Sequence, residues 1–299
     1  MQRRDFLAST ILATMAAGLG NLPSLEDKMV RTPKKIKKCL KIDMVGEKLS
    51  LKDKFSLLKD LGFDGVELNS PNDLAPDEVL LAKEKSGLEI PGVVNSLHWK
   101  YPISDPDPLV RQKCLMGLEQ SLWDCKLYGG SSVLFVPGVV HRTVSYKDAY
   151  ERSQHEIRKI LGTLDKTGVA IAFENVWNSF LLSPLEAARY VDEFKHPLIG
   201  WHFDVGNIVA SGWPEHWINI LDHRIMKLDV KEYSRKKQVE EGIVKGFDVE
   251  LMEGDCNWPE VIKALNKINY SGWASAEIRG GDRARLLAIS KKMDQIFGL

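Results

Sequence analysis

Short runs of apolar and β-branched residues alternate with longer helical patterns along most of this 299-residue chain. Parallel neighbours in a sheet need a crossover connection, usually a helix, so the alternation predicts a parallel sheet. The expected strands cover residues 39–44, 65–68, 90–97, 132–136, 169–174, 198–204, 224–231 and 273–278. The expected helices cover residues 51–61, 76–86, 108–128, 146–167, 185–194, 215–221, 258–268 and 283–297.

Eight strand–helix units in one α/β chain match a (β/α)8 TIM barrel. The competing architecture is an open doubly wound sheet. After the first expected strand, Val45-Gly46-Glu47 offers one glycine instead of the glycine-rich dinucleotide fingerprint of that fold. The sequence therefore predicts a single TIM-barrel catalytic domain over residues 39–299.

The first residues differ from the rest of the chain. Arg3-Arg4 precedes Phe6-Leu7, and an almost entirely apolar run extends from 8 to 20. Such a run is shorter than the roughly 20 residues that a transmembrane helix needs. The pattern resembles a twin-arginine export signal. We expect a signal peptide at 1–22, a tether at 23–38, a periplasmic location and no stable membrane anchor. The alternative is a basic terminus before an amphipathic helix.

Charge and cysteine content exclude several classes of protein. Lys plus Arg and Asp plus Glu both number 41, so the formal net charge is zero and a general nucleic-acid binder is not expected. The four cysteines lie far apart and form no CxxC pair, which argues against a zinc knuckle or a dithiol motif. A homo-oligomer is compatible with the composition.

Polar residues share one face of each late strand. Alternate residues of a barrel strand face inward, and TIM-barrel active sites lie at the carboxyl ends of the strands. The expected inward sets are Ala170, Ala172 and Glu174; Gly200, His202 and Asp204; Lys227, Asp229 and Lys231; and Ser275, Glu277 and Arg279. Glu67 ends an earlier strand and His98 follows another.

Four of these residues are carboxylates that should converge on the barrel axis: Glu174, Asp204, Asp229 and Glu277. They cannot all stay ionised in a confined site without a counter-charge. A divalent cation satisfies this need, and all-oxygen ligation favours Mn²⁺ or Mg²⁺ over zinc. We expect one cation, Mn²⁺ first, with Mg²⁺ or Co²⁺ as alternatives. The competing explanation pairs the carboxylates with Lys227, Lys231 and Arg279.

Several segments together resemble the xylose-isomerase-like TIM barrels, which include sugar and sugar-phosphate isomerases and epimerases. The resemblance covers the chain from Ile36 onward. Its motifs are Gly62-Phe63-Asp64-Gly65-Val66-Glu67-Leu68, Ala172-Phe173-Glu174-Asn175, His202-Phe203-Asp204-Val205-Gly206-Asn207, Gly254-Asp255 and Ala276-Glu277-Ile278. The resemblance to ketose 3-epimerases implies metal ligation by Glu174, Asp204 and Glu277, with Asp229 in the fourth position.

The fourth position departs from the family pattern. The usual His-x-Lys-Asp segment reads Asp229-Val230-Lys231-Glu232 here. A carboxylate in place of an imidazole makes the site harder and more negative. The alignment with the family pattern can also be shifted by two residues. In that alignment Lys227 matches the histidine, and only three metal ligands remain. Asn207 stands where the family often places a histidine, so substrate contacts do not transfer directly at that position.

The chemistry expected of such a site is proton abstraction next to a carbonyl through an enediolate. Glu174 and Glu277 come from roughly opposite strands and are the expected acid–base pair. The expected substrate-binding residues are Glu67, His98, Asn178, His202, Lys231 and Arg279; Trp123 and Trp177 are further candidates. Arg279-Gly280-Gly281 is also a weak candidate for phosphate binding, and His202 is alternatively a positioning group for Asp204.

Three functions remain open from the sequence. The first is an isomerase or epimerase of a keto sugar or sugar phosphate. The second is a metal-dependent lyase that eliminates the aglycone of a 3-keto-glycoside. The third is a non-catalytic sugar-binding barrel. A phosphodiesterase is disfavoured, because the chain has seven histidines and no basic surplus. The expected partner in each case is a small carbohydrate.

Overall fold

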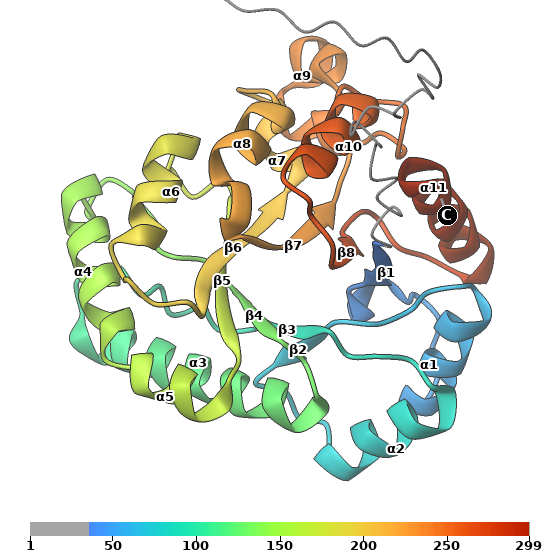
Figure 1. The fold of residues 1–299 in the computed structure, drawn as a ribbon, viewed down its shortest axis with the longest axis horizontal. Coiled ribbons are helices and arrows are strands. Elements are labelled where there is room, and N and C mark those ends of the chain that lie inside the picture. The colour runs from blue at the N-terminus through green and yellow to red at the C-terminus, as the bar shows by residue number, and fades with distance from the viewer. Residues whose placement is uncertain (1–35, 299) are drawn as a thin grey trace, which may run out of the picture. The chain divides into compact units, whose positions relative to one another are not determined.

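The structure is a computed structural model that describes residues 36–298. Eight parallel strands lie at the centre of the fold, with helices outside them (Figure 1). The strands are β1 (Lys37–Leu40), β2 (Leu68–Ser70), β3 (Gly92–Asn95), β4 (Ser132–Phe135), β5 (Ala170–Glu174), β6 (Ile199–Asp204), β7 (Ile225–Val230) and β8 (Trp273–Ala276). The expected signal peptide, and the expected tether up to residue 35, lie outside the described residues.

The strands follow the order β1-β8-β7-β6-β5-β4-β3-β2. A parallel bridge between Lys41 and Glu67 joins the first and last strands of this order. The backbone N–H of Glu67 donates to Leu40 O at 2.8 Å, and Ile42 N–H donates to Glu67 O at 2.9 Å. These bonds bring the two edges of the sheet together, which confirms the predicted TIM barrel.

Helices occupy the crossovers between the strands. The α-helices are α1 (Leu51–Asp60), α2 (Pro76–Ser86), α3 (Pro108–Tyr128), α4 (Tyr146–Arg158), α5 (Leu161–Thr167), α6 (Pro184–Asp192), α7 (Val205–Val209), α8 (Pro214–Leu221), α9 (Arg235–Glu241), α10 (Trp258–Lys267) and α11 (Arg283–Phe297). Three 3-10 helices are η1 (Ile42–Met44), η2 (Asp222–Arg224) and η3 (Ile243–Phe247).

Local signals set the helix ends where they are strong. Helix α3 begins at Pro108, as expected, because Asp107 caps it by accepting from Leu109 N–H at 2.8 Å. It ends before Gly129, whose φ of 80° is the left-handed conformation that glycine adopts easily. Left-handed glycines, Gly87 and Gly298, likewise follow α2 and α11 at their expected ends.

The helix expected over 146–167 is two helices. Lys159 N–H donates to Glu156 O and Ile160 N–H donates to Ile157 O, both at 3.1 Å. These i to i−3 bonds tighten the turn and end the α-helical ladder. The first strand also differs from expectation: β1 begins at Lys37, inside the expected tether, and residues 42–44 form η1.

The expected alternation along the late strands is present. Phe173, Trp201 and Phe203 are fully buried aromatic residues. The Phe173 ring contacts Tyr190 of α6 with 5.3 Å between ring centroids, and the Phe203 ring stacks near Trp217 of α8. Between them along the strands, polar side chains face the barrel interior. In the described part of the chain, no helix combines the length and apolar character needed to cross a bilayer.

Candidate active site

Four carboxylates meet at the carboxyl ends of β5 to β8. We call Glu174, Asp204, Asp229 and Glu277 the carboxylate ring. One oxygen from each lies within 4.8 Å of one oxygen from every other. Asp204 and Asp229 are fully buried, and the strand register places them directly opposite each other. The convergence expected from strand alternation is therefore observed.

The register also separates the two candidates for the fourth position. Lys227 pairs with His202, two residues earlier on each strand, so it lies one layer below Asp204 and Asp229. Asp229, and not Lys227, accordingly contributes to the carboxylate ring.

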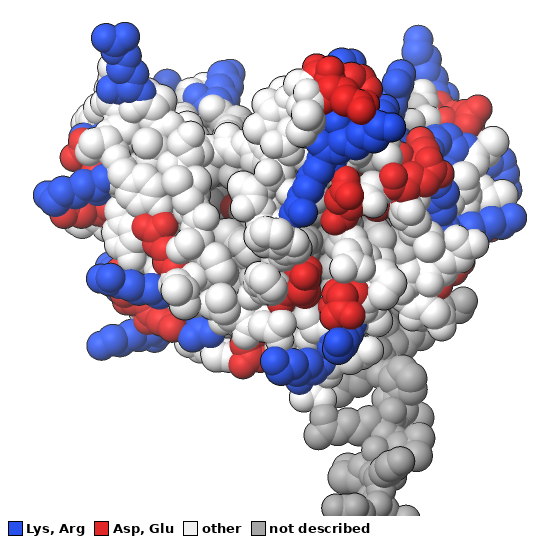
Figure 2. All heavy atoms as spheres, turned by 90° about the horizontal axis from the view of Figure 1, so that it is seen from above, with Lys and Arg blue, Asp and Glu red and all other residues white. Residues whose placement is uncertain are grey.

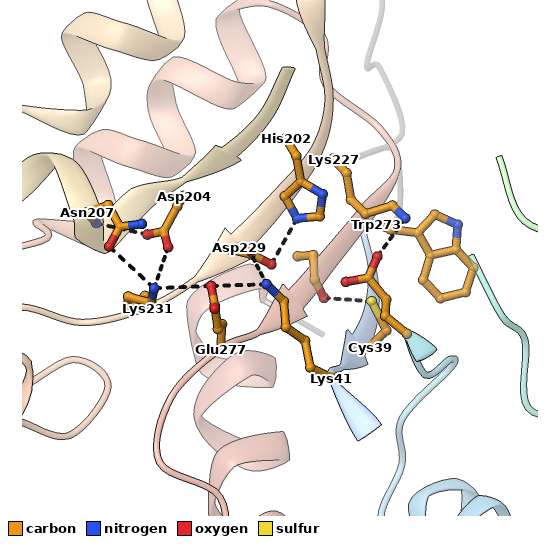
Figure 3. Close-up of polar contacts among 12 residues, drawn as sticks. Cys39, Lys41, His202, Asp204, Asn207, Lys227, Asp229, Lys231, Trp273 and Glu277 are labelled. Atoms are coloured by element: carbon orange, nitrogen blue, oxygen red, sulfur yellow. Dashed lines mark hydrogen bonds and ion pairs between the residues drawn. The ribbon is translucent and has the colours of Figure 1, made fainter. Parts of the chain in front are cut away.

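Two lysines reach the ring from opposite sides (Figure 3). Lys41 Nζ lies 2.7 Å from Asp229 Oδ2 and 3.1 Å from Glu277 Oε2. Lys231 Nζ lies 2.7 Å from Asp204 Oδ2 and 3.1 Å from the same Glu277 oxygen. Glu277 therefore bridges two cations, and the expected pairing of carboxylates with lysines occurs in part. Arg279 takes no part in these ion pairs.

The lysines do not neutralise the ring completely. Four carboxylates face two ammonium groups, so two negative charges remain when all the carboxylates are ionised. Burial and the charge of Glu277 raise the pKa of Glu174 well above its usual range. Burial also raises the pKa of Asp204 to about 6, although Lys231 acts in the opposite direction. The pKa of Glu277 is lowered, because Lys41 and Lys231 outweigh its burial.

The ring fits a divalent cation. Asp204 Oδ2, Asp229 Oδ1 and Glu277 Oε2 are buried and form no hydrogen bond of good geometry with the described residues. The donor set is entirely oxygen, which suits Mn²⁺ or Mg²⁺. A double positive charge would balance the remaining negative charge.

A second charged layer lies beneath the ring. Glu67 Oε1 accepts from Lys227 Nζ at 2.7 Å, and both side chains are almost completely buried. His202 is also fully buried, with Nε2 2.9 Å from Asp229 Oδ1. Glu67 and His202 were expected to touch substrate, but neither lines the cleft described below. His202 instead lies beside Asp229, rather than Asp204, as a candidate positioning group.

Asparagine side chains fix the strand ends that carry the ring. Asn175 Nδ2 donates to Asp204 O at 2.7 Å, and Asn175 Oδ1 accepts from Asp204 N–H at 3.0 Å. Asn207 N–H donates to Asp204 Oδ1 at 2.9 Å, while Asn207 Oδ1 lies 3.3 Å from Lys231 Nζ. These bonds hold Glu174 and Asp204 in a fixed relation. The sequence motif contained Asn175, but its role depends on a partner 29 residues away.

The ring opens into a cleft with two halves. The aromatic half has a volume of about 550 Å³ and is lined by Trp99, Trp177, Phe247, Lys231 and Arg279, among others. The polar half has a volume of about 520 Å³ and is lined by Lys41, Asp43, Asn69, Asn95 and His98, among others. Glu174 and Glu277 line both halves. The two glutamates therefore lie where the aromatic half and the polar half of the cleft meet.

Three further expected residues have distinct positions. His98 lines the polar half, and burial lowers its pKa to about 3, so its imidazole is neutral near pH 7. Arg279 lines the aromatic half. Asn178 does not line either half, because its side chain holds a loop: Nδ2 donates to Gly138 O at 2.7 Å and Oδ1 accepts from Phe180 N–H at 3.2 Å.

The glycines after Arg279 have a packing role. A Cβ at Gly280 would lie 2.0 Å from Met44 O. Gly281 N–H donates to Met44 O at 2.9 Å, and Gly46 N–H donates to Gly281 O at 2.8 Å. The Gly281 N–H is thus already used in joining this loop to the segment after β1, which removes it as a phosphate donor.

Lys41 and Trp99 are the main site residues that sequence reasoning did not identify. Lys41 lies in the first expected strand, 39–44, but nothing in that strand marks it as a site residue, because its partner Asp229 is 188 residues away. Trp99 lines both halves of the cleft and is 53% exposed. Its position directly after His98 was the signal available in the sequence.

The solved structures that resemble this chain share its fold. A D-tagatose 3-epimerase-like protein has a TM-score of 0.74 at 17% identity, covering 88% of this chain and 97% of its own. An AP endonuclease, family 2, from Brucella melitensis has a TM-score of 0.70 at 15% identity, covering 86% and 99%. A 3-keto-D-glucoside 4-epimerase from E. coli has a TM-score of 0.69 at 15% identity, covering 89% and 100%.

A search of curated protein sequences gives no match. The family described as xylose isomerase-like TIM barrel, by contrast, matches residues 55–295. This span holds seven of the eight strands, from β2 to β8, and all four carboxylates of the ring. By this match and by its barrel, the chain belongs to the xylose isomerase-like TIM barrel family.

Proposed function

We propose that this protein is a divalent-metal-dependent epimerase or isomerase of a keto sugar, acting by proton transfer at the carbon next to the carbonyl. The observation that carries this proposal is the position of Glu174 and Glu277, which line both halves of one cleft and belong to one carboxylate ring. The 3-epimerase-like protein and the keto-glucoside epimerase that share this fold support the same substrate class.

Glu174, Asp204, Asp229 and Glu277 would hold the cation, which we propose to be Mn²⁺. A cation there would polarise a substrate carbonyl and the adjacent hydroxyl, so that the neighbouring C–H bond becomes more acidic. Asn175 and Asn207 keep Asp204 oriented toward the ring through the hydrogen bonds described above.

The two glutamates differ electrostatically, which suits a pair that passes a proton in both directions. Lys41 and Lys231 contact Glu277 and favour its ionised form, which makes it the weaker base of the pair. Among the described residues no lysine forms an ion pair with Glu174, and burial together with the charge of Glu277 raises its pKa, which makes it the stronger base of the pair. Pairs of carboxyl groups with separated pKa values are a common arrangement for acid–base catalysis.

We propose an uncharged sugar, rather than a nucleic acid or a sugar phosphate, as the substrate. On the face shown in Figure 2, Lys and Arg side chains lie among Asp and Glu side chains. The expected glycine loop after Arg279 uses its Gly281 N–H in a backbone bond. Trp99 and Trp177 line the aromatic half and offer faces on which a sugar ring can stack. We propose export to the periplasm from the twin-arginine pattern alone.

The test is solvent proton exchange. The purified protein with Mn²⁺ is incubated with ketoses and keto-glycosides in D₂O, and deuterium incorporation is followed by NMR. We expect deuterium at the carbon next to the carbonyl, together with an epimeric or isomeric product. Release of the aglycone without epimer would instead identify a lyase. Sugar binding without any deuterium exchange would indicate a non-catalytic sugar-binding barrel.

A further inference from the structure

A third cavity, of about 330 Å³, adjoins the aromatic half of the cleft. We call it the apolar cavity. Its lining residues come from the segment after β5, from α7 and the turn that follows it, and from α8 and η3. Its apolar lining residues are Val176, Phe180, Leu181, Leu182, Ile208 and Trp217, with Trp177 and Ile243 beside them.

The apolar cavity and the aromatic half share Val176, Trp177 and Asn207. Trp177 is fixed at this boundary, because its Nε1–H donates to Asn207 O at 2.9 Å and its ring packs on Phe247 with 4.9 Å between ring centroids. A ligand that fills the aromatic half is therefore next to the apolar cavity, and Trp177 lines both spaces.

The inner wall of the apolar cavity is formed before any ligand binds. Phe180 and Leu181 are each 3% exposed. Leu181 N–H donates to the hydroxyl of Tyr146 at 2.9 Å, and the Tyr146 ring packs on Phe180. Asn178 ties the same segment to Gly138. A preformed apolar wall loses little conformational entropy on binding.

The exposed rim of the apolar cavity carries the apolar side chains of Leu182 and Ile243 beside Ser179 and Ser211. Leu182 is 68% exposed and Ile243 is 53% exposed. Apolar side chains around a concave site are typical of small-molecule pockets, and covering them on binding is favourable. A free sugar carries a hydroxyl on nearly every carbon, so it would cover this surface with less apolar area than an apolar ring would.

We propose that the substrate is a keto sugar in glycosidic linkage to an apolar, ring-containing aglycone, which occupies the apolar cavity while the sugar lies at the carboxylate ring. The proposal rests on the proposed function for the chemistry at the sugar. A dry apolar cavity of about 150 Å³ is enough to bind benzene, so the volume here accommodates one aromatic ring or two.

The first experiment measures binding without turnover. Phenyl β-D-glucoside and methyl β-D-glucoside, neither of which carries a keto group, are titrated into the Mn²⁺-loaded protein by calorimetry. We expect the phenyl glucoside to bind at least about tenfold more tightly, since even one methylene in an apolar pocket is worth about 10–200-fold. Equal affinities would overturn the proposal.

Two variants test whether the apolar cavity causes the preference for the phenyl glucoside. Leu182→Asp places a charge on the rim of the apolar cavity and should lower the phenyl-to-methyl affinity ratio toward one. Leu109→Asp is the matched control, because Leu109 at the start of α3 is 64% exposed and lies outside the cavities described here. It should leave the ratio unchanged. An equal loss in both variants would overturn the placement of the aglycone.

The second experiment uses the 3-keto forms of the same two glucosides and follows deuterium exchange in D₂O. A higher kcat/KM for the phenyl compound supports the proposal. Exchange at equal rates on both compounds would overturn the proposed apolar aglycone but leave the proposed function intact. A phenyl preference in binding with no exchange on any ketose or keto-glycoside overturns the proposed function alone. If the wild type shows no preference for the phenyl compound and Leu182→Asp changes the mass of the protein in solution, the rim is a contact between copies of the chain.

Discussion

Two layers of charged side chains lie inside the same barrel and differ in how completely their charges are balanced. In the lower layer, one carboxylate, Glu67, meets one ammonium group, Lys227, and neither reaches the cleft. In the upper layer, the four carboxylates of the ring meet two lysines and open into the cleft. We expect a balanced pair closed to solvent to stabilise the fold, and we propose that the unbalanced ring beside the cleft binds the cation and transfers protons.

The largest expected effect is on turnover, through the upper layer. Glu174→Gln and Glu277→Gln should each lower kcat by about 10²–10⁴ or more, because an amide cannot accept or donate the proton at neutral pH. Circular dichroism and thermal melting should show an intact fold. If each glutamate serves one face of the substrate, one variant should still exchange the substrate proton with D₂O and the other should not. Full activity in both variants would refute the acid–base assignment.

The lower layer should affect stability. Lys227→Met leaves Glu67 buried without its partner, and breaking a buried ion pair in this way typically costs about 3–5 kcal/mol. Chemical denaturation measures the change. The double variant Glu67→Gln with Lys227→Met removes both charges and should recover most of the loss. A Lys227→Met protein as stable as the wild type would contradict the structural role of the pair.

Acid should remove the stabilising contribution of the lower layer over a defined range of pH. Burial alone would raise the pKa of Glu67, but Lys227 more than offsets burial and holds the pKa at about 2. A carboxyl group with a depressed folded pKa stabilises the protein above its unfolded pKa and loses that contribution as pH falls through the folded value. Unfolding free energy should therefore fall between about pH 4.5 and pH 2. In the double variant, this part of the pH dependence should disappear.

The smallest expected effect is on cation affinity. Lys41 places a positive charge against two oxygens of the ring, Asp229 Oδ2 and Glu277 Oε2. Lys41→Met removes that charge and should tighten Mn²⁺ binding about tenfold, or about 1.4 kcal/mol. Titration calorimetry measures the change. The matched control is Lys37→Met, whose ammonium group pairs with Glu89 outside the ring and should leave the affinity unchanged. Weaker binding in Lys41→Met would show that Lys41 helps to build the site.

The strand pattern was sufficient to predict the barrel and the carboxylate ring. Alternation is a local property, so Glu174, Asp204 and Glu277 could be assigned to the inner face from their own strands. It also assigned Asp229, although the choice between Asp229 and Lys227 needed the β6–β7 register. Registers depend on contacts between strands, which no single segment encodes.

What the sequence did not reveal depends on distant partners. Lys41 is drawn into the ring by Asp229 from β7, and nothing near Lys41 in the sequence indicates this. Asn178 looks like a sugar ligand by its position after Glu174, but Gly138 and Phe180 use its side chain. The turn between α4 and α5 and the short helices α7 and α9 involve too few residues to give a periodic signal.

The most direct test of the difference between the layers is the number of Mn²⁺ ions bound per chain, measured by equilibrium dialysis and elemental analysis. We predict one ion in the wild type, one in the Glu67→Gln with Lys227→Met variant, and none in Asp204→Asn at the same free Mn²⁺ concentration. Loss of the ion from the double variant, with binding retained in Asp204→Asn, would place the cation in the lower layer. A folded wild-type protein that binds no Mn²⁺, Mg²⁺ or Co²⁺ would contradict the metal site itself.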